Sequence, residues 1–298
     1  MKKINQEKIT TWFVTGASSG VGHEMCKQLL ERGYNVIAVA RRIPGFVHEN
    51  ALCLSVDVTK PETINNAIKS GIERFGKIDV LSNNAGIGAR VTCEEESLEH
   101  MKQVMEVNFF GTFNTINALL PHFRQNKNGT IINNTSQSGI APRSLGTAYC
   151  SSKHAIEGLT GVCWLETYKF CRVMAFELGY YDTTEIGKNR YTIETKFEEY
   201  KNLRNIHRNY YYTFQNDLEK AVSVIIDQAE LEKLPRRLML GRDACIKTKA
   251  EIKWLKRDVK KSIKCTKKCS KYKMELIINL LLKFFNKIQK LIFKNRFL

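Results

Sequence analysis

The feature that most constrains the fold is a glycine-rich turn that joins a short apolar run to a helical segment. The run 11–15 predicts a buried strand, and the pattern of residues 20–32 predicts a helix. The turn between them reads Thr15-Gly16-Ala17-Ser18-Ser19-Gly20-Val21-Gly22. Glycines let this backbone turn tightly, and the free N–H groups at the start of the helix favour a bound anion. Strand, turn and helix together predict the start of a βαβ unit.

The same alternation continues along the chain and predicts an α/β fold built on a doubly wound (Rossmann) parallel sheet. Further strands are predicted at 35–40, 51–56, 79–83, 130–134, 171–177 and 237–240. Further helices are predicted at 61–75, 98–126, 148–170, 217–231 and 243–260. We therefore expect an N-terminal arm at 1–9, one domain at 10–260 and a C-terminal tail at 261–298.

Within the domain, the stretch 180–216 is polar and rich in tyrosine, and it breaks the alternation of strands and helices. We expect it to form a lid over a ligand crevice, because long loops in compact domains tend to be functional. The alternative is a surface excursion without a role at the site.

The cysteines indicate the compartment. Nine cysteines are scattered along the chain without paired CxxC spacing, and no apolar run of signal-peptide length opens the sequence. We expect free thiols in a reducing, cytoplasmic setting. The six histidines show no metal-ligand cluster, so no metal site is expected.

Residues that follow the second and third strands are candidates for cofactor binding, because ligands of doubly wound sheets bind at the carboxyl ends of the strands. An acidic residue after the second strand would bind the ribose hydroxyls of NAD, but this chain has Arg41 and Arg42. Two guanidinium groups suit the 2′-phosphate of NADP, and the alternative is a solvated arginine pair. Asp57 and Val58 follow the third strand, where Asp57 could accept from an adenine amino group or merely begin a helix.

Later segments supply further candidates for cofactor binding, at Asn84, Ala85 and Gly86, and candidates for catalysis. Asn84, Ala85 and Gly86 follow the fourth strand, and Ser136 follows the fifth. The next helix begins with Tyr149-Cys150-Ser151-Ser152-Lys153. A tyrosine and a lysine four residues apart share one helical face, and a cation beside a phenol stabilises the phenolate. This pair could move a proton near neutral pH.

These motifs in this order, together with Asn108 in Met105-Glu106-Val107-Asn108, resemble the short-chain dehydrogenases/reductases, over residues 10 to about 260. The segment 234–244 further resembles the subgroup of reductases similar to 17β-hydroxysteroid dehydrogenases. The resemblance implies a catalytic tetrad of Asn108, Ser136, Tyr149 and Lys153.

The resemblance also implies an activity, namely hydride transfer between NADP(H) and a small-molecule carbonyl or alcohol substrate. Tyr149 would be the general acid/base, Ser136 would bind the same oxygen, Lys153 would also bind the ribose, and Asn108 would hold a water. The alternative is a non-catalytic NADP-binding sensor or scaffold. Homo-oligomers through the helices that precede and contain the Tyr/Lys pair are expected from the family.

One segment departs from the family pattern. After the sixth strand the family reads Pro-Gly and then a threonine that contacts the nicotinamide, whereas this chain reads Leu178-Gly179 and then Thr183. Gly179 and Thr183 are in register with the family residues. The missing proline removes a rigid φ angle and is expected to loosen this loop.

The tail differs from the domain in composition. Of the formal net charge of +17, residues 260–298 contribute +11, with twelve Lys/Arg and one acid. From Met274 the apolar residues recur at helical spacing, which predicts a basic amphipathic helix. We expect peripheral contact with an anionic membrane surface. The alternatives are a partner or second subunit, or packing on its own domain, and no nucleic acid is expected.

Overall fold

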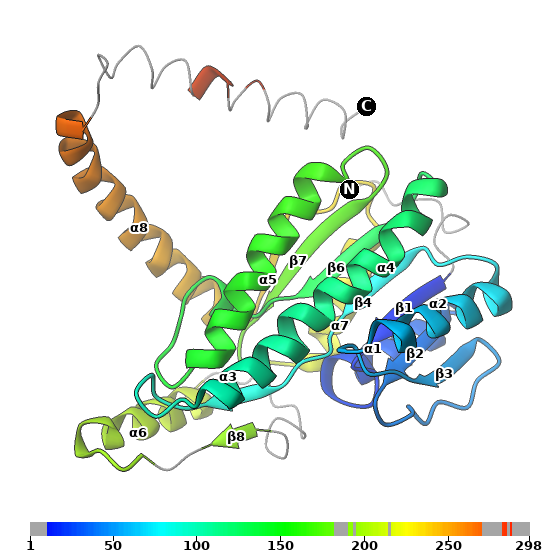
Figure 1. The fold of residues 1–298 in the computed structure, drawn as a ribbon, viewed down its shortest axis with the longest axis horizontal. Coiled ribbons are helices and arrows are strands. Elements are labelled where there is room, and N and C mark those ends of the chain that lie inside the picture. The colour runs from blue at the N-terminus through cyan, green and yellow to red at the C-terminus, as the bar shows by residue number, and fades with distance from the viewer. Residues whose placement is uncertain are drawn as a thin grey trace.

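The computed structural model describes residues 11–181, 190–192, 195–213, 216–269, 282–284 and 287. A parallel sheet of seven strands forms the centre, in the order β3-β2-β1-β4-β6-β7-β9 (Figure 1). The strands are β1 (Thr11–Thr15), β2 (Asn35–Ala40), β3 (Ala51–Ser55), β4 (Val80–Asn83), β6 (Thr130–Asn134), β7 (Arg172–Leu178) and β9 (Arg237–Leu240). The predicted doubly wound sheet is confirmed.

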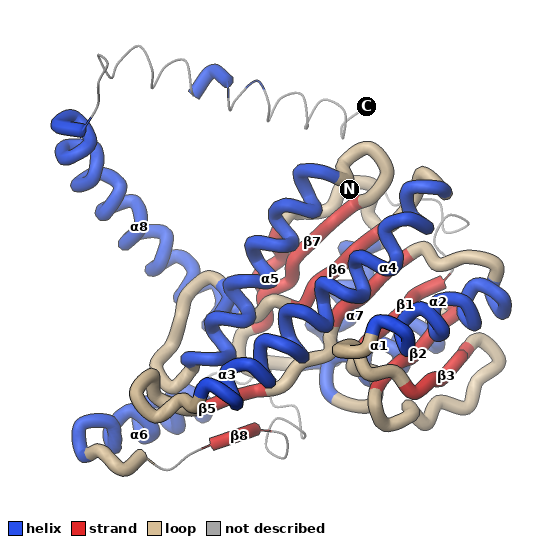
Figure 2. The backbone as a smooth tube through the Cα atoms, viewed as in Figure 1, coloured by secondary structure: helices blue, strands red, loops and turns tan. Residues whose placement is uncertain are grey.

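Helices cover both faces of the sheet, so most strands are buried on both sides. One face packs on α1 (Gly20–Glu31) and α7 (Leu218–Ala229). The other packs on α2 (Pro61–Phe75), α4 (Gly111–Gln125) and α5 (Thr147–Glu166) (Figure 2). Within β1, Trp12 and Val14 belong to the first core and Phe13 to the second, as the alternation of side chains along a strand requires.

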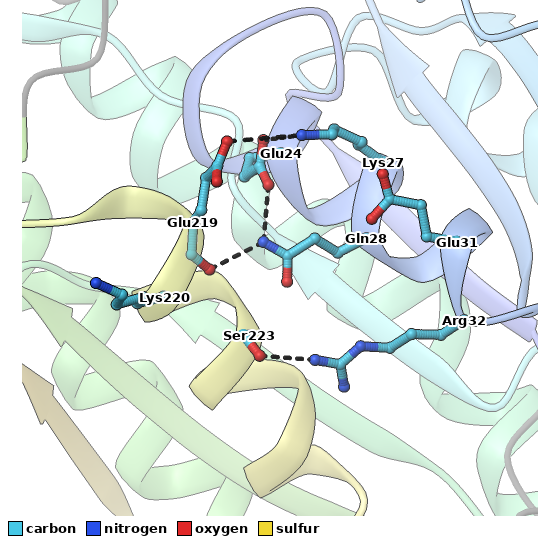
Figure 3. A pocket seen from close by; sticks show the side chains of 8 residues that line it. All are labelled: Glu24, Lys27, Gln28, Glu31, Arg32, Glu219, Lys220 and Ser223. Atoms are coloured by element: carbon cyan, nitrogen blue, oxygen red, sulfur yellow. Dashed lines mark hydrogen bonds and ion pairs between the residues drawn. The ribbon is translucent and has the colours of Figure 1, made fainter.

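Polar side chains tie α7 to α1 along a groove between the two helices (Figure 3). Lys27 lies 3.6 Å from Glu219, and the Gln28 side chain donates to the Glu219 carbonyl oxygen at 2.9 Å. Arg32 donates to Ser223 at 2.8 Å. Exposed pairs of this kind each contribute little stability. Their effect is to fix the position of α7, which lies far along the chain, against α1.

The segment predicted as one helix at 98–126 is instead three elements. They are α3 (Leu98–Met105), a π-helical turn η2 (Glu106–Phe110) and α4. A π-helical turn has one residue more than an α-helical turn, and such turns are frequent at functional sites. This one contains Asn108.

Part of the predicted lid has regular structure. In the described residues, β8 (Arg190–Thr192) pairs in parallel with β5 (Gly88–Arg90), and α6 (Glu198–Thr213) follows. Three consecutive acids connect this segment to the start of α5. Glu94 accepts from the Tyr200 hydroxyl at 2.8 Å, Glu95 accepts from the Lys196 N–H at 2.8 Å, and Glu96 accepts from the Ala148 N–H at 3.4 Å. The segment therefore docks beside the start of α5, and its action as a lid stays a prediction.

The last described long helix, α8 (Arg242–Cys269), extends well past the predicted end at 260. Its first turns pack against the sheet, where Asp243, Ala244 and Thr248 are buried. The helix then leaves the body of the fold (Figure 1). Most of the predicted tail helix lies outside the described residues. Among the described residues, no helix is long and apolar enough to cross a membrane.

Candidate active site

The glycine-rich turn has the geometry of a close backbone cradle. Gly16 has φ +67°, and a Cβ there would lie 2.8 Å from the backbone N of Ala85. A Cβ on Gly22 would lie 2.5 Å from the carbonyl oxygen of Gly16. Gly20, at φ +55°, opens α1, while Val21 is partly buried behind it. Both close approaches exclude a larger side chain, so this turn requires glycine.

The start of α1 has no side-chain cap. Ser19 occupies the N-cap position, but its side chain accepts no capping hydrogen bond. Helices leave their first N–H groups without an intrahelical partner, and the helix dipole makes this end positive. The turn therefore presents the donors and the charge that a phosphate group needs.

The loop after β4 is fastened to the same turn. The hydroxyl oxygen of Thr15 accepts from the N–H groups of Asn84 at 2.9 Å and Ala85 at 3.1 Å. A Cβ on Gly86 would lie 3.2 Å from Oδ1 of Asn108 and 3.9 Å from Nζ of Lys153. The Asn84–Gly86 loop thus lies between the glycine-rich turn and two of the predicted catalytic residues.

The arginine pair after β2 lies beside the glycine-rich turn. Both side chains are exposed, and Nη2 of Arg42 donates to the carbonyl oxygen of Ser18 at 3.3 Å. The hydroxyl of Ser55 donates to the carbonyl oxygen of Arg41 at 3.0 Å, which fixes the backbone at the end of β2. Two positive charges therefore stand at the edge of the cradle.

Asp57 and Val58 lie next to the pair, after β3. Burial raises the pKa of Asp57, but hydrogen bonds from the N–H and hydroxyl of Thr59, with Lys60 and Arg41 nearby, lower it overall. Oδ1 of Asp57 accepts both Thr59 bonds, at 3.0 and 2.8 Å. Val58 is buried against Gly111. The Asp57 side chain thus bonds within its own turn, to Thr59. An adenine contact by Asp57 stays a prediction.

Asn108 is fully buried and links two loops through its side chain. Oδ1 accepts from the N–H of Ile87 at 2.8 Å, and Nδ2 donates to the carbonyl oxygen of Ile87 at 3.1 Å. Nδ2 also donates to Oγ of Ser152 at 3.0 Å, one residue before Lys153. The π-helical turn places Asn108 so that it holds the loop after β4 against α5.

Ser136 follows β6 in a strained backbone conformation. Its φ of +77° is unusual for a residue with a Cβ, and strain of this kind is concentrated at functional sites. Its Oγ accepts from the N–H of Ser138 at 3.3 Å. The sequence carried no signal for this strain.

Tyr149 and Lys153 lie on one face of α5, as their spacing predicts. Nζ of Lys153 lies 5.7 Å from the centroid of the Tyr149 ring and donates to the carbonyl oxygen of Asn134 at 2.7 Å. Arg143, which the sequence did not single out, has Cζ 5.6 Å from the same ring. Two cationic groups therefore lie within about 6 Å of the centre of the phenol ring.

A sequence profile of the short chain dehydrogenase family matches residues 10–194. This chain belongs to the short-chain dehydrogenase family. Dehydrogenase/reductase SDR family member 7 of Mus musculus is 32% identical over 211 residues, which cover 65% of this chain and 60% of that protein. An uncharacterized oxidoreductase of Schizosaccharomyces pombe is 30% identical over 242 residues, which cover 79% of this chain and 83% of that protein.

A solved structure agrees with the family assignment. A short-chain dehydrogenase from Streptomyces avermitilis superposes with a TM-score of 0.80 at 28% identity, over 89% of this chain and 99% of that one. The predicted family is confirmed, and its subgroup resembling 17β-hydroxysteroid dehydrogenases is consistent with these relatives.

Burial tunes the lysine of this short-chain dehydrogenase. Lys153 is 5% exposed, and its burial lowers the pKa of the ammonium group to about 8, although the nearby carboxylate of Glu157 opposes the shift. Burial therefore makes this ammonium group a stronger acid than an exposed lysine.

The loop after β7 departs from the family pattern, and an acid on α8 holds it. A Cβ on Gly179 would lie 2.0 Å from Oδ1 of Asp243. This carboxylate is buried and accepts from the N–H of Tyr180 at 2.8 Å, from Asn216 at 3.0 Å and from Gln137 at 3.2 Å. Asp243 thus fastens the loop that Leu178, in place of the family proline, was expected to loosen. Thr183 lies outside the described residues.

Behind α5, the fold buries a pair of glutamates that sequence reasoning missed. Glu177 on β7 is 0% exposed, and Nε of Arg237 lies 3.7 Å from its Oε1 and 2.8 Å from Oε2 of Glu157. Among the described residues, none donates to the oxygens of Glu177. Burial, followed by the neighbouring carboxylate of Glu157, raises the pKa of Glu177 well above its ordinary value. Burial therefore favours the protonated form of Glu177.

This pair makes stability depend on pH. A carboxyl group with a raised folded-state pKa stabilises the fold fully below its unfolded pKa, and this contribution is lost as pH rises toward the folded pKa, by about 1.4 kcal/mol per unit. Glu177→Gln keeps a donor for Glu157 and removes the titration. We expect its free energy of unfolding to exceed that of the wild type by about 1–3 kcal/mol at pH 8, and by far less at pH 5.

Thermal or urea unfolding at the two pH values measures this difference. Glu73→Gln, at an exposed position on α2, is the matched control and should change stability little at either pH. A Glu177→Gln protein that is less stable than the wild type at pH 8 would show that the carboxyl group is ionised and paired.

Proposed function

We propose that this protein is an NADP(H)-dependent oxidoreductase that interconverts a carbonyl and an alcohol on a small-molecule substrate. The observation that carries the proposal is the arrangement of Tyr149, Lys153, Ser136 and Asn108. All four follow the carboxyl ends of the strands or contact the loops there, and the glycine-rich turn beside them has the uncapped helix start that suits a phosphate group. A binding-only protein has no need of a tyrosine held over a buried lysine.

The residues present fit a nicotinamide dinucleotide. Gly16 and Gly22 keep the cradle free of side chains, and the uncapped start of α1 offers N–H donors. Gly86 leaves space between this cradle and Lys153. Once bound there, the nicotinamide would supply the hydride.

The chain's own groups would handle the proton and the charge on the substrate oxygen. Tyr149 gives its hydroxyl proton to that oxygen in reduction and takes it back in oxidation. The Lys153 ammonium stabilises the phenolate that forms, and Ser136 donates a hydrogen bond to the same oxygen. Donors fixed in advance stabilise the charge that develops in the transition state. Asn108 holds the loop after β4 against α5 through its bonds to Ile87 and Ser152. That Asn108 also holds a water molecule is part of the proposal.

The arginine pair supports NADP over NAD. Arg42 reaches the carbonyl oxygen of Ser18 in the cradle, and Arg41 is close enough to Asp57 to lower its pKa. A guanidinium fork matches the geometry and the charge of a phosphate.

The test combines binding with turnover. NADPH binding is measured by fluorescence titration, and NADPH oxidation is followed with a panel of sugar, lipid and steroid carbonyls. We expect binding and turnover with at least one carbonyl class. Tight NADPH binding with no turnover of any carbonyl in the panel would contradict the proposal. It would favour the alternative, a sensor or scaffold.

We also propose a homo-oligomer that forms through α4 and α5. Exposed apolar side chains gather on these helices and on the turn before α4. They are Phe110, Phe113, Val162 and Leu165. A sedimentation experiment that finds a monomer at micromolar concentration would contradict this.

A cytoplasmic location is part of the same proposal. It is supported by the eight cysteines from Cys26 to Cys265, which are free thiols in the part of the chain whose side chains the structure describes. Cell fractionation tests it, and recovery from a secretory compartment would contradict it.

A further inference from the structure

The outer part of α8 carries large apolar side chains that no described residue covers. Between Ile252 and Ile263 every residue is exposed. The exposed fractions are 43% for Ile252, 61% for Leu255, 50% for Val259 and 46% for Ile263. A helix on the surface of a globular protein normally places its apolar residues against the core of that protein. Figure 1 shows this part of α8 extending away from the body of the fold.

These apolar residues form one narrow strip. Their spacings of three, four and four residues place Ile252, Leu255, Val259 and Ile263 on one side of an α-helix. Trp254 is also exposed, at 56%, but the helical rotation places it well away from this strip.

A row of positive charges follows one edge of the strip. Lys249, Lys256 and Lys260 follow its edge at spacings of seven and four residues. The neighbouring face adds further exposed basic residues, at Lys253, Arg257 and Lys261. Only two acids, Glu251 and Asp258, lie between 249 and 261.

We infer that residues 249–263 of α8 bind the surface of an anionic lipid bilayer, with the apolar strip inserted at the headgroup boundary and the lysines against lipid phosphates and carboxylates. An apolar strip along a strongly basic helix is the combination that surface binding requires. This site lies before the tail helix that is predicted from Met274, and it does not depend on the proposed oxidoreductase activity.

Charge complementarity favours lipid over a second copy of the chain. Residues 249–263 carry six Lys/Arg and two acids. Two α8 helices joined along the strip would therefore bring two segments of like net charge together, and these would repel each other. An anionic bilayer attracts the same lysines, each with an energy that corresponds to about a fivefold change in binding.

The test uses the full-length chain and sedimentation with lipid vesicles. One set contains phosphatidylcholine alone, and the other contains about 30% phosphatidylserine. We expect binding to the anionic vesicles and weak binding to the neutral ones. Lys256→Glu with Lys260→Glu should lower binding to anionic vesicles about tenfold or more, and Leu255→Ser with Val259→Ser should lower it comparably.

Trp254→Ser is the matched control, since it removes an exposed apolar side chain away from the strip, and it should leave vesicle binding nearly unchanged. All these residues are exposed, so unchanged melting temperatures would show that the variants fold. Vesicle binding that survives both double substitutions would place the contact elsewhere, and the proposal would fail. Dimerisation that depends on Leu255 and Val259, without vesicle binding, would also overturn it in favour of a second copy.

Discussion

Replacing Tyr149 by phenylalanine is expected to lower kcat by about a thousandfold while NADPH binding stays close to that of the wild type. The substitution removes only the hydroxyl group. The ring would keep its place near Arg143 and Lys153, whose cationic groups lie 5.6 and 5.7 Å from its centroid. The loss would therefore report the proton transfer itself.

A matched control is available in the same chain. Tyr168 also has a lysine near its ring, with Nζ of Lys169 at 5.9 Å from the centroid, but it lies just beyond the far end of α5. Tyr168→Phe should leave kcat unchanged. If Tyr149→Phe retained most of the turnover, another group would have to supply the proton and the proposed role of Tyr149 would be wrong.

Replacing both Arg41 and Arg42 by alanine is expected to lower kcat/KM for NADPH by about a hundredfold or more, with little loss for NADH. A hydrogen bond to a charged group contributes about 1.5–3 kcal/mol, and this double substitution removes two candidate partners of the 2′-phosphate. Both side chains are exposed, so we expect the double substitution to change the stability of the fold little.

Steady-state kinetics with the two cofactors measure the change in preference. Arg124→Ala is the matched control, because it removes the same charge from the exposed last turn of α4, shortly before β6 begins and so away from the carboxyl ends of the strands. Equal losses for NADPH and NADH in the double variant would mean that the arginines do not read the 2′-phosphate.

Local patterns predicted most of the fold. The strands at 11–15, 35–40 and 130–134 have the predicted bounds because apolar and β-branched runs between turn residues are local signals. The π-helical turn at Asn108 was not predicted, since one inserted residue hardly disturbs an apolar period of 3.6. Helix α6 was missed because its sequence is polar overall and rich in tyrosine, so its few apolar residues did not stand out as a helical pattern.

The parts of the candidate site that lie within one short motif could be predicted from the sequence. The contacts between segments that are distant in the sequence could not. The Tyr149/Lys153 pair and the glycine-rich turn follow from spacing within one helix and one turn. Asp243 reaches Tyr180 and Gln137 from the start of α8, and Glu177 meets Arg237 from a neighbouring strand. Such contacts depend on how the sheet brings remote parts of the chain together.

The most direct test of the central claim is to follow deuterium from labelled NADPH into product by mass spectrometry. NADPH carries deuterium at both hydrogen positions of the reactive carbon of its nicotinamide ring and is supplied with a carbonyl substrate found by the turnover panel. Direct hydride transfer predicts one deuterium on the new alcohol carbon with the wild-type protein, and almost no product with Tyr149→Phe. Product formed without deuterium, or at an equal rate in the variant, would contradict the account.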